Sequence, residues 1–599
     1  MSVETAAPAA PQAGHDAPAA ATRGGRAWWL VAIAVVVPVL AAAMSIVGRH
    51  WYPSGDHALE VLRIHDVATR HTPLLGAWSR WGWAHPGPAL FYVLAPFERL
   101  FGETGVLVGM GLLNAFAIGA TVAVAHRRGG ITFAALTGLA VALLVRALGV
   151  DLVVDPWNPW AALFPFLLFV LLAWSVLCRD WRALAFAVVG GSFVVQAHAG
   201  YLPFVVVLLG GAAAYAVAGA IRGSAAPADR RAARRALGIA ALVGLVVWLP
   251  ALVQQAFGKH PNISAMVSYI RHPNEPAAGW TLAWGTFGEE LRPVAPWVGG
   301  DDDNGFGLTA VAAVWPAALT LAALGAAGLF AWRRGRTHSA RLAAIAVVST
   351  AIAVLSTARL TGGFFVYTMR WWWIVAAVAN LALVWAVLQA VDRSRLRRAA
   401  TWLAVGGVVV TGVMTMTDLP ARVPLADNSR VVAALSDPVA AALDRDSRYL
   451  VLSFDLTELG YASRGLYLEL ERRGFHVSAE HAEAADLQFG SWRLATPGEV
   501  DGLISVADVS DVAFRPPPGS RRIAGYDPLT PAERAREIGL EQSIRAQMGD
   551  RAPEGRVLVN NGFLQYVAEQ AGARRDDVAE LSRLQARGNG FAVYLSPAA

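Results

Sequence analysis

The sequence predicts a polytopic α-helical membrane protein with about eleven transmembrane helices and a C-terminal extracytoplasmic α/β domain. Of its 599 residues, 55% are hydrophobic and 16% are charged, which is more apolar than soluble domains are. Apolar runs long enough to cross a bilayer recur up to residue 416, and none follows residue 425. These observations divide the chain into a tail at 1–26, a membrane domain at 27–420 and a soluble domain at 421–599.

The N-terminal tail is rich in Ala and Pro and has few large apolar residues, so it is predicted to be disordered and cytoplasmic. Arg23 and Arg26 precede the first apolar run, at 28–47. This run could be read as a signal peptide, but it is long for one and many spans follow, which favours an uncleaved first helix.

The arginines orient the spans that follow. Every Arg cluster falls on one side of the membrane, predicted to be cytoplasmic, and nearly every junction rich in Asp or His falls on the other. The run at 87–102 is short and contains Pro96, so it is predicted to be a partly embedded helix of an external loop at 49–103. The remaining spans are predicted at 105–125, 131–150, 157–177, 184–195, 202–221, 237–257, 308–332, 342–355, 365–388 and 402–416.

The formal net charge is +6, which in a soluble protein is one sign of nucleic-acid binding. Here the arginines lie in short clusters between apolar runs, so the predicted partner is the lipid bilayer and not nucleic acid. Cys178 is the only cysteine, and the chain therefore has no intramolecular disulfide.

The soluble domain shows apolar runs typical of short strands around one clear helix. The predicted strands are 449–454, 476–478, 556–559 and 591–595, and the predicted helix is 457–473. The domain has no clear phosphate-binding Gly loop, so the candidate chemistry lies in the membrane domain.

The start of the external loop carries ionisable groups beside a hydrophobic span, which suggests a functional site. Ser54 and Gly55 are a plausible helix start, after which Asp56, Glu60 and Arg63 fall on one helix face. A carboxylate there could deprotonate an acceptor hydroxyl. The alternative is structural: Asp56 caps the helix and Glu60 pairs with Arg63. For the adjacent His65 and Asp66, solvated loop charges are favoured, because consecutive helical residues point apart.

The end of the loop combines tryptophans with a rigid turn. Three tryptophans alternate with polar residues, including Arg80, between residues 78 and 83. Pro86 and Pro88 restrict the backbone and can hold His85 at the mouth of a cavity, as a candidate phosphate ligand. The alternative is an aromatic belt in which the arginine contacts lipid headgroups.

Further polar residues are predicted on the same side of the membrane. Asp155 could hold acceptor hydroxyls or assist Asp56, or it could cap the next helix. Gln196, His198 and Tyr201 should line water, a ligand or one another, since an unpaired buried polar group costs about 1 to 3 kcal/mol.

Two arginines stand near the same outer surface, on either side of an aromatic-rich segment. Arg359 and Arg370 suit a lipid-linked phosphate, because Arg offers several fixed donors and stays charged. Snorkelling toward headgroups is the alternative.

Together these motifs resemble the GT-C superfamily of polytopic glycosyltransferases, which includes aminoarabinose transferases, protein mannosyltransferases and actinobacterial arabinofuranosyltransferases. The resemblance rests on the early acidic Asp56, the turn from His85 to Pro88, the Leu100-Phe101-Gly102 ending and the second acidic junction at Asp155. It covers roughly residues 27 to 400.

The resemblance implies transfer of a pentose or hexose from a polyprenyl phosphate to an envelope glycan, lipid or protein on the outer face, with inversion. Asp56 would be the general base, and His85, Arg359 and Arg370 would bind the donor phosphate. The composition, rich in Ala and Arg and poor in Lys, looks actinobacterial and suggests arabinofuranose or mannose in cell-wall biogenesis.

Two departures from the family pattern bear on cofactors. The usual Pro-Pro is here Pro86-Gly87-Pro88, and Asp155 stands alone instead of in an acidic pair. A divalent cation prefers several oxygen ligands, and Asp155 alone supplies few. No cofactor is therefore assigned, and the question of whether the protein binds a divalent cation stays open. The competing hypothesis is a transporter, flippase or binding protein for lipid-linked intermediates. Such proteins often show inverted repeats, and none is evident here.

Overall fold

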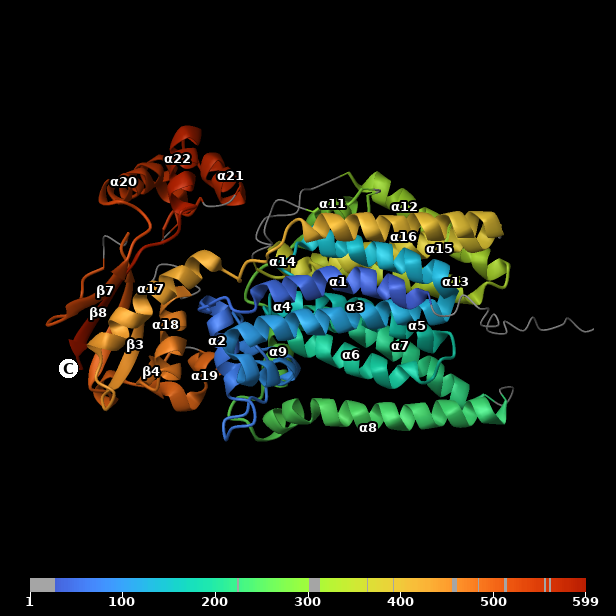
Figure 1. Ribbon diagram of the computed structural model, residues 1–599, viewed down its shortest axis with the longest axis horizontal. Coiled ribbons are helices and arrows are strands. Elements are labelled where there is room, and N and C mark those ends of the chain that lie inside the picture. Colours follow the sequence, from blue (N-terminus) through green and yellow to red (C-terminus); the bar gives the residue numbers. More distant parts are fainter. Residues whose placement is uncertain are drawn as a thin grey trace, which may run out of the picture.

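The computed structural model describes residues 27–222, 226–292, 294–300, 313–362, 365–391, 393–454, 461–482, 484–510, 514–553, 556–559 and 562–598. The predicted disordered tail at 1–26 lies outside these residues. The structure is a bundle of long apolar helices that abuts a smaller domain built on a β-sheet (Figure 1). The chain is therefore a multi-pass α-helical membrane protein with a C-terminal α/β domain.

Nine helices within the described residues are long and apolar enough to cross a membrane. This number counts α3 once, although α3 contains two of the predicted spans. It takes α5 and the short helix before it as one segment, Asn158–Leu177, and leaves out α6, which has 15 residues. The long helices are α1 Trp28–Ile46, α3 Ala89–Leu148, α5 Leu163–Leu177, α6 Ala183–Ala197, α7 Leu202–Ile221, α8 Pro227–Phe257, α12 Val314–Arg333, α13 Thr337–Arg359, α15 Trp371–Val391 and α16 Ser394–Met416.

Helix α3 is broken twice at glycines. Gly102 and Gly130 both have φ of 67°, a backbone conformation that only glycine adopts without strain. The part of α3 before Gly102 corresponds to the helix predicted in the external loop. The part after Gly130 is the span predicted from residue 131. Two turns that the sequence places between helices are therefore sharp glycine kinks.

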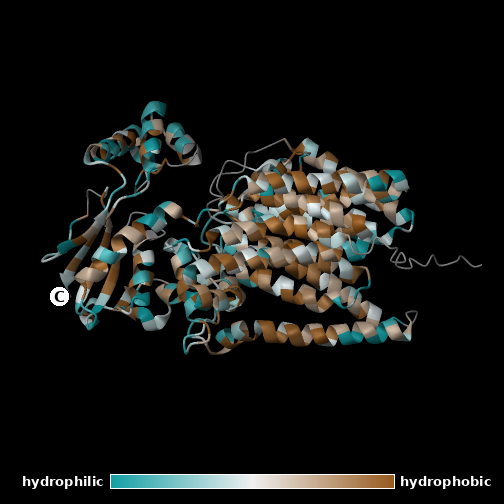
Figure 2. Cartoon of the chain, viewed as in Figure 1, coloured by the Kyte–Doolittle hydropathy of each residue, from teal (hydrophilic) through white to brown (hydrophobic). Residues whose placement is uncertain are grey.

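Short elements gather at the end of the bundle that faces the sheet domain (Figure 1). They are α2 Gly55–His65, the hairpin of β1 Trp78–Ser79 and β2 Trp83–Ala84, α4 Asn158–Ala161, η1 Ala199–Tyr201, α9 Asn262–Arg271, α10 Gly279–Glu290, α11 Pro296–Gly299 and α14 Val366–Met369. The helices between the two ends are mostly apolar, as Figure 2 shows. The bundle thus has one end built of loops and short helices.

Arginine and aspartate pairs join helix ends and the turns beside them, away from the short elements. Asp180 accepts hydrogen bonds from Arg127 at 2.7 Å and from Arg128 at 3.0 Å, and Arg179 pairs with Asp229. The three arginines belong to the clusters that are predicted to be cytoplasmic.

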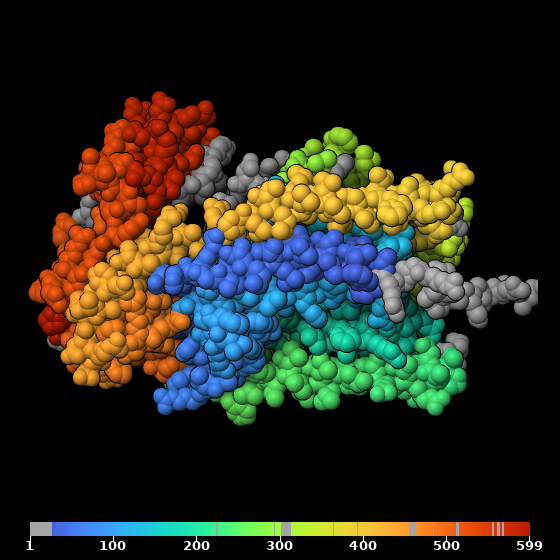
Figure 3. Space-filling view, viewed as in Figure 1, coloured from blue at the N-terminus to red at the C-terminus, as the bar shows by residue number. Residues whose placement is uncertain are grey.

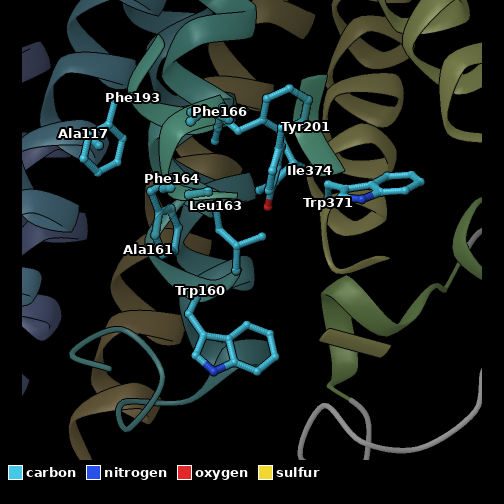
Figure 4. Close-up of a cluster of buried hydrophobic side chains, with 14 of the residues drawn as sticks. Ala117, Trp160, Ala161, Leu163, Phe164, Phe166, Phe193, Tyr201, Trp371 and Ile374 are labelled. Carbon is cyan, nitrogen blue, oxygen red and sulfur yellow. The ribbon is translucent and has the colours of Figure 1, made fainter. Parts of the chain in front are cut away.

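One apolar core runs through the bundle and continues into the C-terminal domain. Its largest fully buried side chains include Trp174, Trp372 and Tyr201. Figure 4 shows Tyr201 among aromatic and aliphatic side chains of neighbouring helices. The two domains are therefore packed against each other, as the space-filling view in Figure 3 also shows.

The C-terminal domain contains a six-stranded sheet in the order β5-β4-β3-β6-β8-β7. The first four strands are parallel, and β8 runs antiparallel to both of its neighbours. The strands are β3 Arg448–Phe454, β4 His476–Glu480, β5 Leu494–Ala495, β6 Gly502–Asp508, β7 Arg521–Tyr526 and β8 Phe591–Pro597. The helices that accompany the sheet are α17 Ala426–Ala442, α18 Tyr461–Arg472 and α19 Ala485–Phe489. The strands predicted at 449–454, 476–478 and 591–595 are confirmed, and so is the described part of the predicted helix.

The strand predicted at 556–559 is wrong. This segment runs beside three helices inserted between β7 and β8, namely α20 Pro531–Met548, α21 Gly562–Gln570 and α22 Arg575–Gln585. Side chains, and not a neighbouring strand, satisfy the backbone groups of this segment. Val557 N donates to Glu541 at 2.9 Å. Gln585 accepts from Val559 N at 2.8 Å and donates to Val557 O at 2.9 Å. The apolar pattern of the segment reflects burial in the small core of these helices.

A buried arginine ties this insertion to the sheet. Arg556 donates to Asp508, at the end of β6, at 3.1 Å and to Glu537 on α20 at 2.6 Å. Its side chain is 2% exposed. Removing one member of such a network leaves buried charges without a partner, which costs about 3 to 5 kcal/mol.

We therefore expect Arg556→Met to lower the unfolding temperature of the C-terminal domain sharply, in thermal scans of the purified full chain. Arg574→Gln is the matched control, because Arg574 pairs with Asp577 while 72% exposed, and exposed pairs contribute about 1 kcal/mol or less. Equal unfolding temperatures for the two variants would show that Arg556 does not hold the insertion in place.

Candidate active site

A small cavity open to solvent lies where helix α2 meets the C-terminal domain. Helix α2 begins directly after Ser54, as predicted, and Asp56, Glu60 and Arg63 all line the cavity from it. The remaining lining residues are Leu59, Ala77, Trp78, Phe91, Asn158, Leu487 and Gln488. The cavity therefore takes its walls from both domains.

Asp56 is held by an arginine of the C-terminal domain. Its Oδ1 accepts a hydrogen bond from Arg464 Nη1 at 3.2 Å, and the side chain is 31% exposed. The other terminal nitrogen of Arg464 donates to Gln488 Oε1 at 3.2 Å. Sequence reasoning missed Arg464, because it lies 408 residues from its partner in a domain with no catalytic motif.

Glu60 is buried beside Asp56. Its Oε1 accepts a hydrogen bond from the backbone N–H of Asn158 at 3.2 Å, while its Oε2 has no partner within the described residues. Burial, and then the charges of Asp56 and Asp155, raise the pKa of Glu60 well above its usual value, against the opposing effect of the Asn158 N–H. The Glu60 carboxyl group therefore keeps its proton at a pH where free glutamate is ionised.

The structural alternative, in which Glu60 pairs with Arg63, is not found among the described contacts. Arg63 Nη1 donates instead to Asp66 at 3.0 Å. Asp66 is only 4% exposed, so its assignment as a solvated loop charge is wrong. Both carboxylate oxygens of Asp66 accept from Arg493 of the C-terminal domain at 2.9 Å, and Arg493 also pairs with Glu471 at 2.7 Å. The structural reason is that the C-terminal domain covers this end of α2.

Asp155 lies on the same side of the bundle as α2. Its Oδ1 is 2.7 Å from His57 Nε2 and accepts from the Trp157 N–H at 2.8 Å, just before α4. The two acidic junctions that the sequence places on one side of the membrane are therefore joined by a direct contact. In this structure Asp155 positions the start of α4.

His85 sits in a buried pair of imidazoles. Its Nδ1 accepts the backbone N–H of Ala199 at 3.0 Å, and its ring centre is 5.0 Å from that of His198. Burial, and then the neighbouring His198, hold the pKa of His85 well below its usual value, and burial lowers the pKa of His198 to about 4. His85 is thus neutral near pH 7, and with Nδ1 accepting, its proton is on Nε2.

Gln196 explains the glycine in the Pro86-Gly87-Pro88 turn. A Cβ atom on Gly87 would lie 2.3 Å from Gln196 Oε1, so a larger residue would collide. The same oxygen accepts from Ala89 N at 3.3 Å, and Gln196 Nε2 donates to Val247 O at 3.1 Å. Gln196 therefore joins the start of α3 to α8.

The other predicted residues are spread around this end of the bundle. Tyr201 is buried with its ring 5.0 Å from that of Phe166 (Figure 4). Arg370 is buried with its guanidinium 4.2 Å from the ring centre of Trp373. Arg80 is exposed and lies over Trp81 at 4.8 Å, and Arg359 is exposed at the end of α13. Of the ten predicted site residues, only Asp56 and Glu60 line the cavity.

No group of three or more His, Cys, Asp or Glu side chains within the described ranges is arranged to hold a metal ion. The cavity instead offers a partly exposed carboxylate, a protonated carboxyl group, an arginine and an amide. Such a set can bind hydroxyl groups and accept a proton.

Comparison with known proteins gives structural matches alone. No protein-family model matches the chain, and no curated protein matches it in sequence. ArnT from Cupriavidus metallidurans in the apo state matches with a TM-score of 0.48 and 14% identity, over 84% of this chain and 96% of that one. ArnT bound to undecaprenyl phosphate matches with a TM-score of 0.38 and 16% identity, over 83% of this chain and 96% of that one.

The archaeal oligosaccharyltransferase AglB from Archaeoglobus fulgidus, in complex with an inhibitory peptide and a dolichol-phosphate, matches with a TM-score of 0.38 and 10% identity. This match covers 81% of this chain and 70% of that one. With identities of 10% to 16% and TM-scores below 0.5, these matches are a likeness of fold and nothing more. At these scores no residue role passes from them to this chain.

The raised pKa of Glu60 predicts a pH effect on stability. Unfolded Glu60 ionises above about pH 4.3, whereas the folded state keeps the proton, so stability falls as pH rises from there to the folded pKa. A tenfold difference in proton affinity between the folded and unfolded states corresponds to about 1.4 kcal/mol. We expect the unfolding temperature of the wild type to fall more steeply than that of Glu60→Gln between pH 5 and 8. Parallel curves for the two proteins would contradict a buried, protonated Glu60.

Proposed function

We propose that this protein is a GT-C-type glycosyltransferase that moves a sugar from a polyprenyl phosphate to an acceptor hydroxyl on the outer face of the membrane. The observation that carries this proposal is the cavity at the junction of the two domains, lined by Asp56 and Glu60 on one face of α2. A cavity with convergent polar groups at a domain interface is a common place for a binding site.

In the proposed reaction Asp56 is the general base. The acceptor oxygen gives its proton to the Asp56 carboxylate and attacks the anomeric carbon of the donor sugar. The bond from that carbon to the phosphate oxygen breaks, the polyprenyl phosphate leaves with the electron pair, and the anomeric centre is inverted. Arg464 orients the carboxylate through its contact with Oδ1, and Asp56 remains partly open to the cavity.

The donor phosphate is assigned to Arg370, with His85 as a neutral hydrogen-bond donor through Nε2. Arg370 supplies a permanent positive charge, which stabilises the departing phosphate. Arg80 and Arg359 are exposed, where a lipid phosphate can reach them from the bilayer surface. Gln196 and Asp155 hold backbone groups around this region, and the rings of His198 and Tyr201 pack against His85 and Phe166.

The donor sugar is proposed to be a pentose or hexose, with arabinofuranose and mannose as the first candidates, and the acceptor a component of the cell envelope. The low-Lys, high-Ala composition supports an actinobacterial cell wall as the setting. Measuring transfer by the purified protein with and without a divalent cation tests whether the reaction requires a metal ion.

We expect Asp56→Asn to lower kcat by about 10²- to 10⁴-fold, the usual contribution of a general base, while binding of the polyprenyl-phosphate sugar is retained. The measurement is transfer of a radiolabelled sugar from a panel of polyprenyl-phosphate donors to envelope acceptors. Asp437→Asn is the control, because Asp437 is 84% exposed and pairs with Arg473 away from the cavity. Normal transfer by Asp56→Asn would rule out the proposed base. Movement of the lipid-linked sugar across proteoliposomes without transfer would favour the transporter hypothesis.

The proposal also requires the C-terminal domain to lie outside the cytoplasm. In a Cys178→Ser background, we expect Asp427→Cys to react with a membrane-impermeant maleimide in intact spheroplasts, and Arg231→Cys to react only after lysis. Both parent residues are exposed, and Arg231 belongs to a basic cluster of the kind retained in the cytoplasm. The reverse labelling pattern would place the candidate site inside the cell.

A further inference from the structure

The cavity contains a buried carboxyl oxygen for which the protein supplies no partner. Glu60 Oε2 is shielded from solvent and makes no hydrogen bond within the described residues, although Glu60 lines the cavity. An unsatisfied buried polar atom costs about 1 to 3 kcal/mol. Because this atom lies beside the cavity, it is placed to form a hydrogen bond with a ligand bound there.

Other walls of the cavity offer groups that suit the same ligand. Trp78 Nε1 is also buried without a partner within the described part of the chain, so it has a free N–H donor. Gln488 brings an amide from the C-terminal domain, and Leu59 and Phe91 bring apolar surface. Donors and acceptors placed around apolar surface match a sugar ring, in which each hydroxyl both donates and accepts and the C–H faces are apolar.

The spacing of the two carboxyl groups defines how such a ligand would bind. Asp56 and Glu60 are four residues apart on α2, so they are neighbours on one helix face. An acceptor with a single hydroxyl, such as a serine or threonine side chain, can satisfy Asp56 but leaves Glu60 Oε2 without a partner. An acceptor with adjacent hydroxyls can satisfy both.

We propose that this cavity is the acceptor subsite and that the acceptor is a carbohydrate, with one hydroxyl at Asp56 and a second hydroxyl of the same sugar at Glu60. This inference rests on the proposed function. It narrows the acceptor from any envelope glycan, lipid or protein to a polyhydroxylated ring. Glu60 then determines specificity, since a site built to bind a hydroxyl rejects ligands that lack one.

Arg464 is the positioning residue of this subsite. It holds Asp56 through Nη1 and Gln488 through Nη2, and its guanidinium lies 5.9 Å from the ring centre of Trp78. One side chain of the C-terminal domain thus fixes the base and an opposite wall of the cavity together. The domain contributes to transfer without supplying a reacting group.

The first test compares acceptors and Glu60 variants. Transfer from a polyprenyl-phosphate sugar is measured with octyl glycosides and with a serine-containing peptide, and KM is determined separately for donor and acceptor. We expect the glycosides to be the better acceptors. Glu60→Leu should raise the glycoside KM at least about tenfold and leave the donor KM unchanged, because the second hydroxyl loses its partner. Glu60→Gln should restore most of the affinity, since an amide can still form that hydrogen bond.

Glu98→Gln is the matched control for Glu60. Glu98 is also a buried carboxyl group of this region, but it pairs with His65 at 3.1 Å and does not line the cavity. We expect the KM of the Glu98→Gln variant for the glycosides to equal that of the wild type. A rise in KM common to Glu60→Leu and Glu98→Gln would reveal a structural effect and overturn the proposed contact.

The second test concerns Arg464. Arg464→Gln should lower kcat and raise the glycoside KM about tenfold or more, because Asp56 and Gln488 both lose their partner. Arg464→Lys should recover part of kcat but not of KM, since one ammonium cannot reproduce the forked contact with two groups. Arg473→Gln is the control, because Arg473 follows the same helix and pairs with Asp437 outside the cavity. Equal losses for the Lys and Gln variants would contradict the positioning role.

The outcomes separate this inference from the proposed function. A wild-type protein that consumes no donor with any acceptor would contradict the proposed glycosyltransferase activity. A wild-type protein that glycosylates the peptide and not the glycosides would contradict only the carbohydrate subsite. If Glu60→Leu changed only the donor KM, Glu60 would contact the donor. That result would also overturn the assignment of Glu60 to the acceptor subsite.

Discussion

The arrangement of the candidate site depends on the buried ion cluster formed by Arg493, Asp66 and Glu471. Arg493 lies between the carboxylate at the end of α2 and the carboxylate on α18, with hydrogen bonds of 2.7 to 2.9 Å to both. Two carboxylates around one guanidinium fix the angle between the domains, because the planar fork accepts few geometries. Trp492 adds a stacked contact with His71 at 4.0 Å. These contacts place Arg464 against Asp56.

Packing of the C-terminal domain against α2 changes the environment of the carboxyl groups on this helix. On its own, α2 would be an exposed amphipathic helix at the bundle end. The C-terminal domain and the segment after Asp155 bury its polar face, so Glu60 becomes a neutral hydrogen-bonding group while Asp56 stays partly exposed. Two carboxyl groups one helical turn apart thereby lie in different environments, one buried and one partly open to the cavity.

The sequence predicted the fold class and the helix that carries Asp56 and Glu60. These features follow from hydrophobic run length and helical spacing, which are local properties of the chain. The partners Arg464 and Arg493 could not be predicted, because they approach α2 from more than 400 residues away and carry no motif. The false strand at 556–559 has the same cause, since a pattern of buried residues does not reveal whether helices or strands cover them. The lowered pKa of His85 likewise results from burial, which no local sequence pattern reports.

The order of strands in the sheet has a consequence for biosynthesis. Strand β8 lies between β6 and β7, although it follows the whole helical insertion in the chain. The membrane helices and α2 are therefore translated and inserted well before the sheet that supports α18 and α19 can close. Until β8 has been made and pairs with both strands, β6 and β7 are not joined, so the sheet behind α18 and α19 is completed only after the helical insertion has been translated.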